Sequence, residues 1–281
     1  MKTILLPTDF SDNAWNAIKY AIQLYNDELC TFYLFNTYTP VIYNVGFGLD
    51  TSTQYILNDA AKTASETGLK ELMERIAKEF GTNSSHTFKP LAKFNTLVFG
   101  IKELLDEQPI DLIVMGTKGA TGAKEVLFGS NTVHVFKHIK APILAIPADF
   151  AYESPHEILF PTDLQTAYDK TPLNLLKDIA VTHNSRVNAL HVSTGYELTA
   201  AQEAHKATLE RFFSGGAYLY HEMEQMEVPE AIQKFQLRYK INMLAMINNK
   251  HSIFENLFFK STINKIGFHL NIPFLVMSVK K

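Results

Sequence analysis

The chain has 281 residues, 46% of them hydrophobic, and a formal net charge of −3 at pH 7. This length predicts about two domains. A pI near 6.4 argues against the broad positive surface that nucleic acid or anionic lipid requires. We therefore expect neither nucleic acid nor a membrane among the partners of this protein.

The cysteine content and the apolar runs indicate the compartment. Cys30 is the only cysteine, which excludes a disulfide within the chain and argues against a thiolate metal cluster. No apolar stretch is long enough to span a bilayer, and the first apolar run reaches Asp9 too early for a signal segment. The sequence thus predicts a reducing, cytoplasmic location.

The first third of the chain opens with a strand, a turn and a helix. We expect a strand at Thr3 to Leu6 and a helix at Ser11 to Leu24, with Ser11 as the N-cap. A near-continuous apolar strand, Thr31 to Tyr38, is typical of a buried parallel sheet. Residues 39–53 hold Pro, Gly and several aromatic residues, and are interpreted as a loop that serves as a lid or a subunit contact.

Strands and helices keep alternating up to residue 146. The pattern predicts an α/β fold with a parallel sheet covered on both faces, in which ligands bind at the carboxyl ends of the strands. Gly81 stops the first long helix. The remaining predicted elements are a helix at 55–80, a strand near 86–90, a helix at 96–107, a strand at 112–115, a helix at 130–138 and a strand at 143–146.

A glycine-rich loop separates the strand at 112–115 from the helix at 130–138. Gly116, Gly119 and Gly122 lie in this loop, and Gly129 precedes the helix at Ser130. Glycine lets backbone N–H groups approach a ligand, and a helix N-terminus adds further donors, so the layout favours a phosphate site. The alternative for each single glycine is the geometry of a tight turn.

The second half of the chain repeats the first. Residues 158–163 read Ile-Leu-Phe-Pro-Thr-Asp where residues 4–9 read Ile-Leu-Leu-Pro-Thr-Asp, and Met246 and Pro273 take the places of Met115 and Pro142. Internal repetition of one α/β unit predicts two domains, 1–149 and 155–281.

These residues resemble a known family. The run Leu-Pro-Thr-Asp-Phe-Ser at 6–11, with Gly116, Gly119, Gly129 and Ser130 at their spacing, is similar to the universal stress protein (UspA-like) family in its tandem form. The resemblance implies two Rossmann-like, adenine nucleotide alpha hydrolase-like domains, each with a five-stranded parallel sheet. It also implies pairing of the last strands, 143–146 with 274–277, and leaves a homodimer of chains as an option.

The resemblance further implies an adenine nucleotide in the first domain, namely ATP with AMP and ADP as alternatives, with Mg²⁺ as an optional companion. Asp9 would meet the base, and the glycines and the helix start would hold the ribose and phosphates. Asn36 and Asn131 depart from the small or apolar residues usual in the family. The expected nucleotide-binding residues are Pro7, Thr8, Asp9, Asn36, Met115, Gly116, Gly119, Gly129, Ser130, Asn131 and Thr132.

The second half has lost this glycine pattern. Ile247, Lys250 and Lys260 replace Gly116, Gly119 and Gly129, although Asp163 and Ser261 are kept. Long side chains would lie where phosphate or ribose must lie, and none adopts positive φ readily. We therefore expect the second domain to bind no nucleotide and to serve as a permanent pairing partner or as the site of another ligand.

Several other chemistries have little support in the sequence. Lys118 is not followed by the Gly-Lys-Ser/Thr of a Walker motif, and Ser130 lies outside any Gly-x-Ser-x-Gly. His134 and His138 share a helix face but lack a third metal ligand. Asp9 has an alternative role as the acid of a helix start. We assign no catalytic and no metal-binding residue.

Three functions from different classes stay open. The favoured one is a cytoplasmic stress-response regulator that binds ATP and is recognised by a protein partner not yet identified. The second is a slow ATPase or phosphotransferase, for which no general base or pair of Mg²⁺-holding carboxylates is evident. The third is a structural interaction protein that binds no nucleotide.

Overall fold

The structure is a computed structural model that describes residues 1–39, 51–117, 129–168, 173–193, 195–249, 253 and 271–278, without the side chains of 51–55. The chain divides into two compact units, Met1–Ile139 and Lys140–Lys281. Most of the predicted loop at 39–53 lies outside the described residues, as do Lys118, Gly119, Gly122, Lys250, Lys260 and Ser261.

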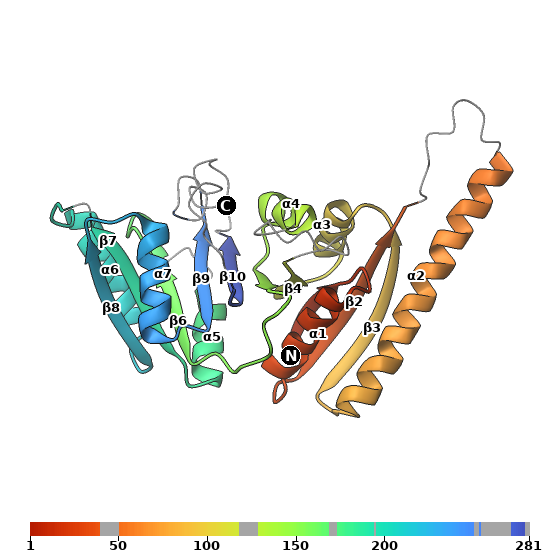
Figure 1. Cartoon of the computed structure of the whole chain (residues 1–281), viewed down its shortest axis with the longest axis horizontal. Coiled ribbons are helices and arrows are strands. Elements are labelled where there is room, and N and C mark those ends of the chain that lie inside the picture. Colours follow the sequence, from red (N-terminus) through yellow and green to blue (C-terminus); the bar gives the residue numbers. More distant parts are fainter. Residues whose placement is uncertain are drawn as a thin grey trace. The chain divides into compact units, whose positions relative to one another are not determined.

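The first unit alternates strands and helices (Figure 1). Its elements are β1 (Lys2–Pro7), α1 (Asp12–Leu24), β2 (Cys30–Tyr38), α2 (Thr51–Phe80), β3 (His86–Phe94), α3 (Leu97–Glu107), β4 (Leu112–Gly116) and α4 (Ser130–His138).

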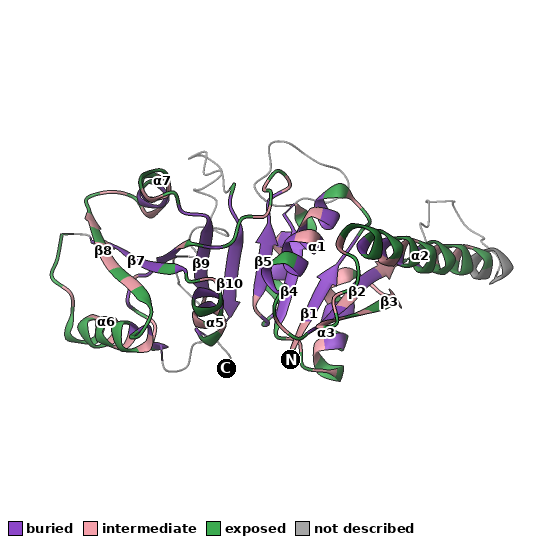
Figure 2. Ribbon diagram, turned by 90° about the horizontal axis from the view of Figure 1, so that it is seen from below, coloured by how far each residue is buried: buried purple, intermediate pink, exposed green. Residues whose placement is uncertain are grey.

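The strands of the first unit lie in the order β3-β2-β1-β4 and are all parallel. Ile4 at the centre of β1 pairs with Phe32 on one side and with Leu112 on the other. Figure 2 shows α1 and α2 on one face of this sheet and α3 on the other. The predicted parallel sheet with helices on both faces is confirmed.

The second unit begins with β5 (Ile143–Ile146). Its further elements are β6 (Glu157–Pro161), α5 (Asn174–Thr182), β7 (Arg186–Ser193), α6 (Ala200–Phe212), β8 (Ala217–Glu224), α7 (Val228–Tyr239), β9 (Met243–Asn248) and β10 (Phe274–Ser278).

The strand order of the second unit repeats that of the first. β8-β7-β6-β9 corresponds to β3-β2-β1-β4, and β10 continues the sheet as a fifth parallel strand beside β9. β5 lies antiparallel to β10, with Leu144 opposite Leu275, so the two strands that were expected to pair do so. In the division into compact units, β5 belongs to the second unit.

Local sequence accounts for several element boundaries. Ser11 caps α1, since its Oγ accepts the N–H of Ala14 at 3.2 Å. Gly81 follows α2 with a φ of 68°, a conformation that glycine adopts without steric cost. Two boundaries differ from expectation: residues 51–53 belong to α2 rather than to the preceding loop, and β3 continues past Pro90 to Phe94.

The core of each unit lies between its sheet and its helices, as the burial colours of Figure 2 show. The central strands are almost fully buried, which explains their near-continuous apolar sequence. The projecting start of α2 has no such cover, and Ile56 is 65% exposed. Among the described residues, no helix has the length and apolar character required to cross a membrane.

Candidate functional site

The turn after β1 begins the site. Thr8 donates its N–H to the carbonyl of Phe35 on β2 at 2.9 Å, and its Oγ1 accepts the N–H of Phe10 at 3.0 Å. Phe10 has a φ of 62°, which is uncommon for a non-glycine residue. Asp9 Oδ1 accepts the N–H and the hydroxyl of Ser11 at 3.1 and 2.5 Å, so this acid holds the turn that leads into α1.

Asn36 ties three elements together below this turn. Its Nδ2 donates to the Thr8 carbonyl at 2.7 Å, and its Oδ1 accepts the hydroxyl of Ser65 on α2 at 2.6 Å. The side chain is 9% exposed, and both ends of the amide are therefore used within the protein. An amide has a second N–H and a second lone pair, which are the groups left to meet a ligand.

The end of β4 and the start of α4 form the opposite side of the site. Gly129 donates its N–H to the Thr117 carbonyl at 2.6 Å, and the hydroxyl of Thr132 donates to the Gly116 carbonyl at 3.0 Å. Gly129 is the N-cap of α4 and offers no side-chain cap. The first N–H groups of α4 therefore have no side-chain cap, and the helix dipole at this end favours an anion.

These segments surround one pocket of about 140 Å³ at the carboxyl ends of β1, β2 and β4. The expected residues in its wall are Pro7, Thr8, Asp9, Asn36, Met115, Gly116, Asn131 and Thr132. Gly129 and Ser130 begin α4 beside the pocket without lining it, and Gly119 lies outside the described residues. The structure also places Ala14, Thr37 and Leu97 in the wall, which the sequence reasoning missed.

Each missed residue adjoins an expected feature. Thr37 follows Asn36, Leu97 opens α3, and Ala14 lies in the first turn of α1. Ala14 could have been predicted, because it is a small residue in the first turn of a helix that follows directly after a strand end. No comparable signal marked Leu97, because its position depends on how α3 packs.

Gly116 also has a packing role in addition to the expected ligand role. A Cβ at Gly116 would lie 2.7 Å from Cγ of Asn13, whose side chain is 8% exposed. Real Cβ atoms do not approach neighbours so closely, so the absence of a side chain at Gly116 lets α1 pack against the end of β4.

The second unit repeats the turn but not the pocket. Thr162 Oγ1 accepts the N–H of Leu164 at 3.0 Å, and Leu164 has a φ of 59°, as Phe10 does in the first unit. His191 takes the place of Asn36, with Nδ1 at 3.0 Å from the Thr162 carbonyl. The framework of hydrogen bonds around the turn is therefore common to both units.

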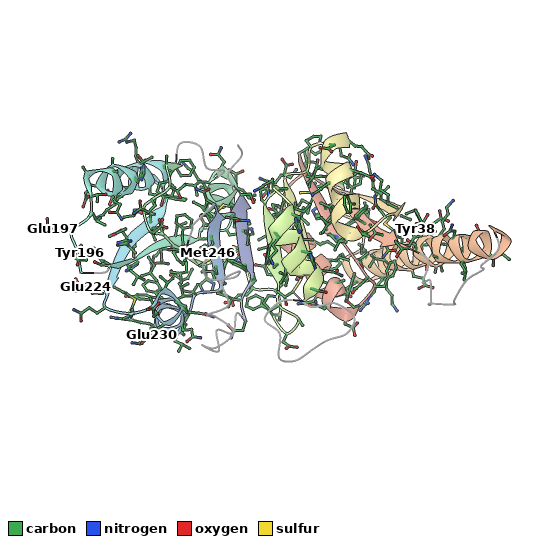
Figure 3. All side chains as sticks on the ribbon, turned by 90° about the horizontal axis from the view of Figure 1, so that it is seen from above. Tyr38, Tyr196, Glu197, Glu224, Glu230 and Met246 are labelled. Carbon is green, nitrogen blue, oxygen red and sulfur yellow. The ribbon has the colours of Figure 1, made fainter. Side chains whose placement is uncertain are left out.

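The corresponding cavity in the second unit measures only about 20 Å³. Ile247, at the position equivalent to Gly116, and Tyr168 line it together with Met246, which Figure 3 labels on β9. The Tyr168 hydroxyl is hydrogen-bonded to that of Thr162. Burial raises the pKa of Tyr168 well above its ordinary value, so the phenol stays protonated.

Two other features singled out in the sequence lie outside the wall of the pocket. His134 and His138 stack on α4 with ring centroids 6.1 Å apart, and no group of three potential metal ligands occurs among the described residues. Of the aromatic cluster at 38–47, only Tyr38 is described; it ends β2 (Figure 3), and its ring lies 5.8 Å from that of Phe94.

Fold and pocket together define an α/β protein with a Rossmann-like strand order and a ligand pocket at the carboxyl edge of its first sheet. The sequence model of the universal stress protein family matches residues 1–147. The chain therefore belongs to the universal stress protein family.

Individual relatives agree with this assignment. The universal stress protein MJ0531 of Methanocaldococcus jannaschii is 29% identical over 148 residues, which are 52% of this chain and 81% of that protein. A universal stress protein from Archaeoglobus fulgidus is similar in structure with a TM-score of 0.68 at 18% identity, over 99% of this chain and 97% of that chain.

A further solved structure is a universal stress protein in complex with cAMP. It is 23% identical over 52% of this chain and 96% of that chain, with a TM-score of 0.36.

Proposed function

We propose that this protein is a stress-response regulator that binds an adenine nucleotide, ATP in the first place, in the pocket of its first unit. The proposal rests on one observation. Residues that were expected to bind the nucleotide, and that come from four separate segments of the chain, line a single pocket. The resemblance to the universal stress protein family implies that these residues meet at one nucleotide.

Different residues of the pocket wall would contact the base and the phosphates of the nucleotide. Pro7, Thr8 and Met115 would flank the base, with Asp9 as an acceptor at its edge. Asn131, Thr132 and the backbone at the start of α4 would meet the phosphates. A Mg²⁺ ion would accompany the triphosphate through phosphate oxygens, as this ion commonly does in proteins.

The second unit would bind no nucleotide. Its cavity of about 20 Å³ has room for about one water molecule, whereas the pocket of the first unit is about seven times larger. The side chains of Ile247 and the buried Tyr168 line this cavity, whereas Gly116 contributes no side chain to the pocket of the first unit. We propose two repeated domains, 1–149 and 155–281, of which only the first responds to the nucleotide.

The regulatory role rests on binding rather than turnover. No catalytic residue is proposed, and the protein is assigned to the cytoplasm, where adenine nucleotides are present. A partner protein or a second copy of the chain would recognise the nucleotide-bound state. No specific observation favours hydrolysis over this role.

The proposal is tested by mass spectrometry of nucleotide released from gently purified protein. We expect an adenine nucleotide from the wild-type chain and its loss from Gly129→Lys, because a long side chain at the start of α4 would fill the phosphate position. Ile247→Ala, at the position of the second unit that is equivalent to Gly116, is expected to leave the nucleotide content unchanged.

Two results would contradict the proposal. One is a wild-type chain that carries no nucleotide and binds none when ATP is added back. The other is a Gly129→Lys chain that folds normally, as judged by circular dichroism, and retains as much nucleotide as the wild type.

A further inference from the structure

The second unit contains a cavity far from its degenerate nucleotide site. The cavity measures about 410 Å³ and lies beside the amino ends of β7 and β8, between the ends of α5 and α6. The nucleotide positions lie at the carboxyl ends of the strands. The residues that line the cavity are Lys177, Ala180, Val181, Asn184, Ser185, Val187, Phe213, Ser214, Gly215, Gly216 and Ala217.

The two units differ in the turn beside this cavity. In the first unit the residue after α1 is Tyr25, which is 1% exposed, and the connection to β2 continues to Leu29. In the second unit the residue after α5 is His183, whose Nδ1 lies 3.0 Å from Ser154 Oγ, and the connection to β7 ends at Ser185. The turn that leads into β7, from which Asn184 and Ser185 line the cavity, is therefore shorter than its counterpart in the first unit.

The walls of the cavity are apolar and held in place. Val187 and Phe213 are 1% and 4% exposed, and the Phe213 ring stacks on Tyr218 with centroids 5.5 Å apart. Val181, which also lines the cavity, is 63% exposed and therefore lies at its rim. An apolar wall with an exposed apolar rim favours a hydrocarbon or aromatic ligand.

Lys177 is the one cationic residue in the described lining of the cavity. The ammonium of Lys177 donates to the carbonyl of Phe212 at 2.8 Å and lies 4.9 Å from the Phe212 ring. The carbonyl uses one of three N–H donors, and it carries no full charge to balance the lysine. No Asp or Glu belongs to the described lining, and no described carboxylate forms an ion pair with Lys177.

We propose that this cavity binds a small amphipathic carboxylate, with its carboxylate on Lys177 and its aryl or alkyl body against Phe213, Val187 and Val181. A cavity of about 410 Å³ falls in the size range of small-molecule sites. A carboxylate would supply the negative charge that balances the Lys177 ammonium. Hydrogen bonds between charged groups are stronger than those between neutral groups.

This site is independent of the proposed nucleotide function. It lies in the second unit and at the opposite ends of the strands from the nucleotide positions. ATP is therefore expected neither to compete with the carboxylate nor to be required for its binding. Failure of one proposal would leave the other unaffected.

The test uses 4-phenylbutyrate and its neutral counterpart 4-phenylbutan-1-ol, titrated against the full chain by ligand-observed NMR. The acid is expected to bind about tenfold more tightly than the alcohol, the difference that one charge-assisted hydrogen bond provides. Lys177→Gln is expected to lower the affinity for the acid to that for the alcohol and to leave the affinity for the alcohol unchanged. A general loss of structure would lower both affinities.

Two further variants serve as controls. Gly216→Phe should abolish binding of both probes by filling the cavity, because a Cβ there meets only the Phe213 carbonyl, at 3.6 Å. Lys206→Gln removes a lysine that lies 4.2 Å from the Tyr220 ring and outside the cavity, and should leave binding unchanged.

Equal binding of acid and alcohol to the wild-type chain would overturn the proposal, as would no binding of either probe up to its solubility limit. Loss of acid binding in Lys206→Gln to the same degree as in Lys177→Gln would also overturn it. If Gly216→Phe does not fold, the comparison of Lys177→Gln with Lys206→Gln still decides the outcome.

Discussion

The Asn13 side chain packs where a Cβ at Gly116 would lie. Asn13 is buried on α1, and Gly116 ends β4. The sequence correctly marked Gly116 as a special position and assigned it to a ligand, but it gave no sign of Asn13, which is more than a hundred residues away in the chain. Contacts of this kind depend on how two elements pack, and local patterns do not contain that information.

This contact predicts the effect of Gly116→Ala. The new methyl group would displace the Asn13 side chain in a closely packed region, and overpacking of this kind costs about 1–3 kcal/mol of unfolding free energy. Urea denaturation measures the loss. The double variant Asn13→Ala with Gly116→Ala makes room for the methyl group and should lose less than the sum of the single changes; strict additivity would contradict the packing role.

At the scale of elements, polar side chains cross three neighbouring strands of the second unit. His221 on β8 donates from Nε2 to Asn188 Oδ1 on β7 at 3.0 Å, and Asn188 donates to Glu157 on β6 at 2.8 Å. Arg186 lies 3.1 Å from the same carboxylate, and Phe235 and Tyr239 of α7 pack against the imidazole. The network joins the strands on the face that α7 covers.

The same network predicts a pH dependence of stability. Burial, together with the charge of Arg186, holds the pKa of His221 below its ordinary value, and Arg238 acts in the same direction while Glu157 opposes it. The unfolded chain then binds a proton that the folded chain does not. The contribution of His221 is present above about pH 6.5, the ordinary histidine pKa, and is lost as pH falls through and below it.

Urea denaturation at about pH 8 and about pH 5, on either side of that pKa, measures this effect. His221→Gln should reduce the difference in unfolding free energy between the two conditions. His138→Gln, which changes an exposed histidine on α4, is the control and should reproduce the wild-type difference. An undiminished difference in His221→Gln would show that this histidine does not carry the effect.

Sequence patterns predicted the elements well where periodicity and caps agree. Ser11 and Gly81 marked the start of α1 and the end of α2, and the apolar runs located the central strands. The patterns failed at the start of α2, where Thr51 to Thr53 are polar and the apolar period begins later. They also ended β3 too early, because Pro90 suggests a break but β3 is an edge strand that tolerates it.

At the scale of the whole molecule, one α/β arrangement occurs twice, and the two copies differ in the pocket at the carboxyl ends of their strands. The repeated Thr-Asp turns and strand orders show that both units share a framework. Comparing Gly116 with Ile247 in the sequence predicted that the second unit binds no nucleotide, and the cavity at the equivalent place measures about 20 Å³. The part played by Tyr168 was not predictable, because its ring reaches the cavity through the fold of its own loop.

The cavity beside Lys177 also escaped prediction from the sequence. It adjoins a turn after α5 that is shorter than the turn after α1, and no residue pattern marks it. Only a comparison of the two folded units makes that difference visible.

The central claim is that one chain holds two equivalent frameworks and a single nucleotide site. Isothermal titration calorimetry of the nucleotide-free chain with ATP tests it most directly, because it counts sites. We predict one nucleotide per chain for the wild type and for Ile247→Ala, and none for Gly129→Lys. Two nucleotides per wild-type chain, or one that persists in Gly129→Lys and is lost in Ile247→Ala, would contradict the claim.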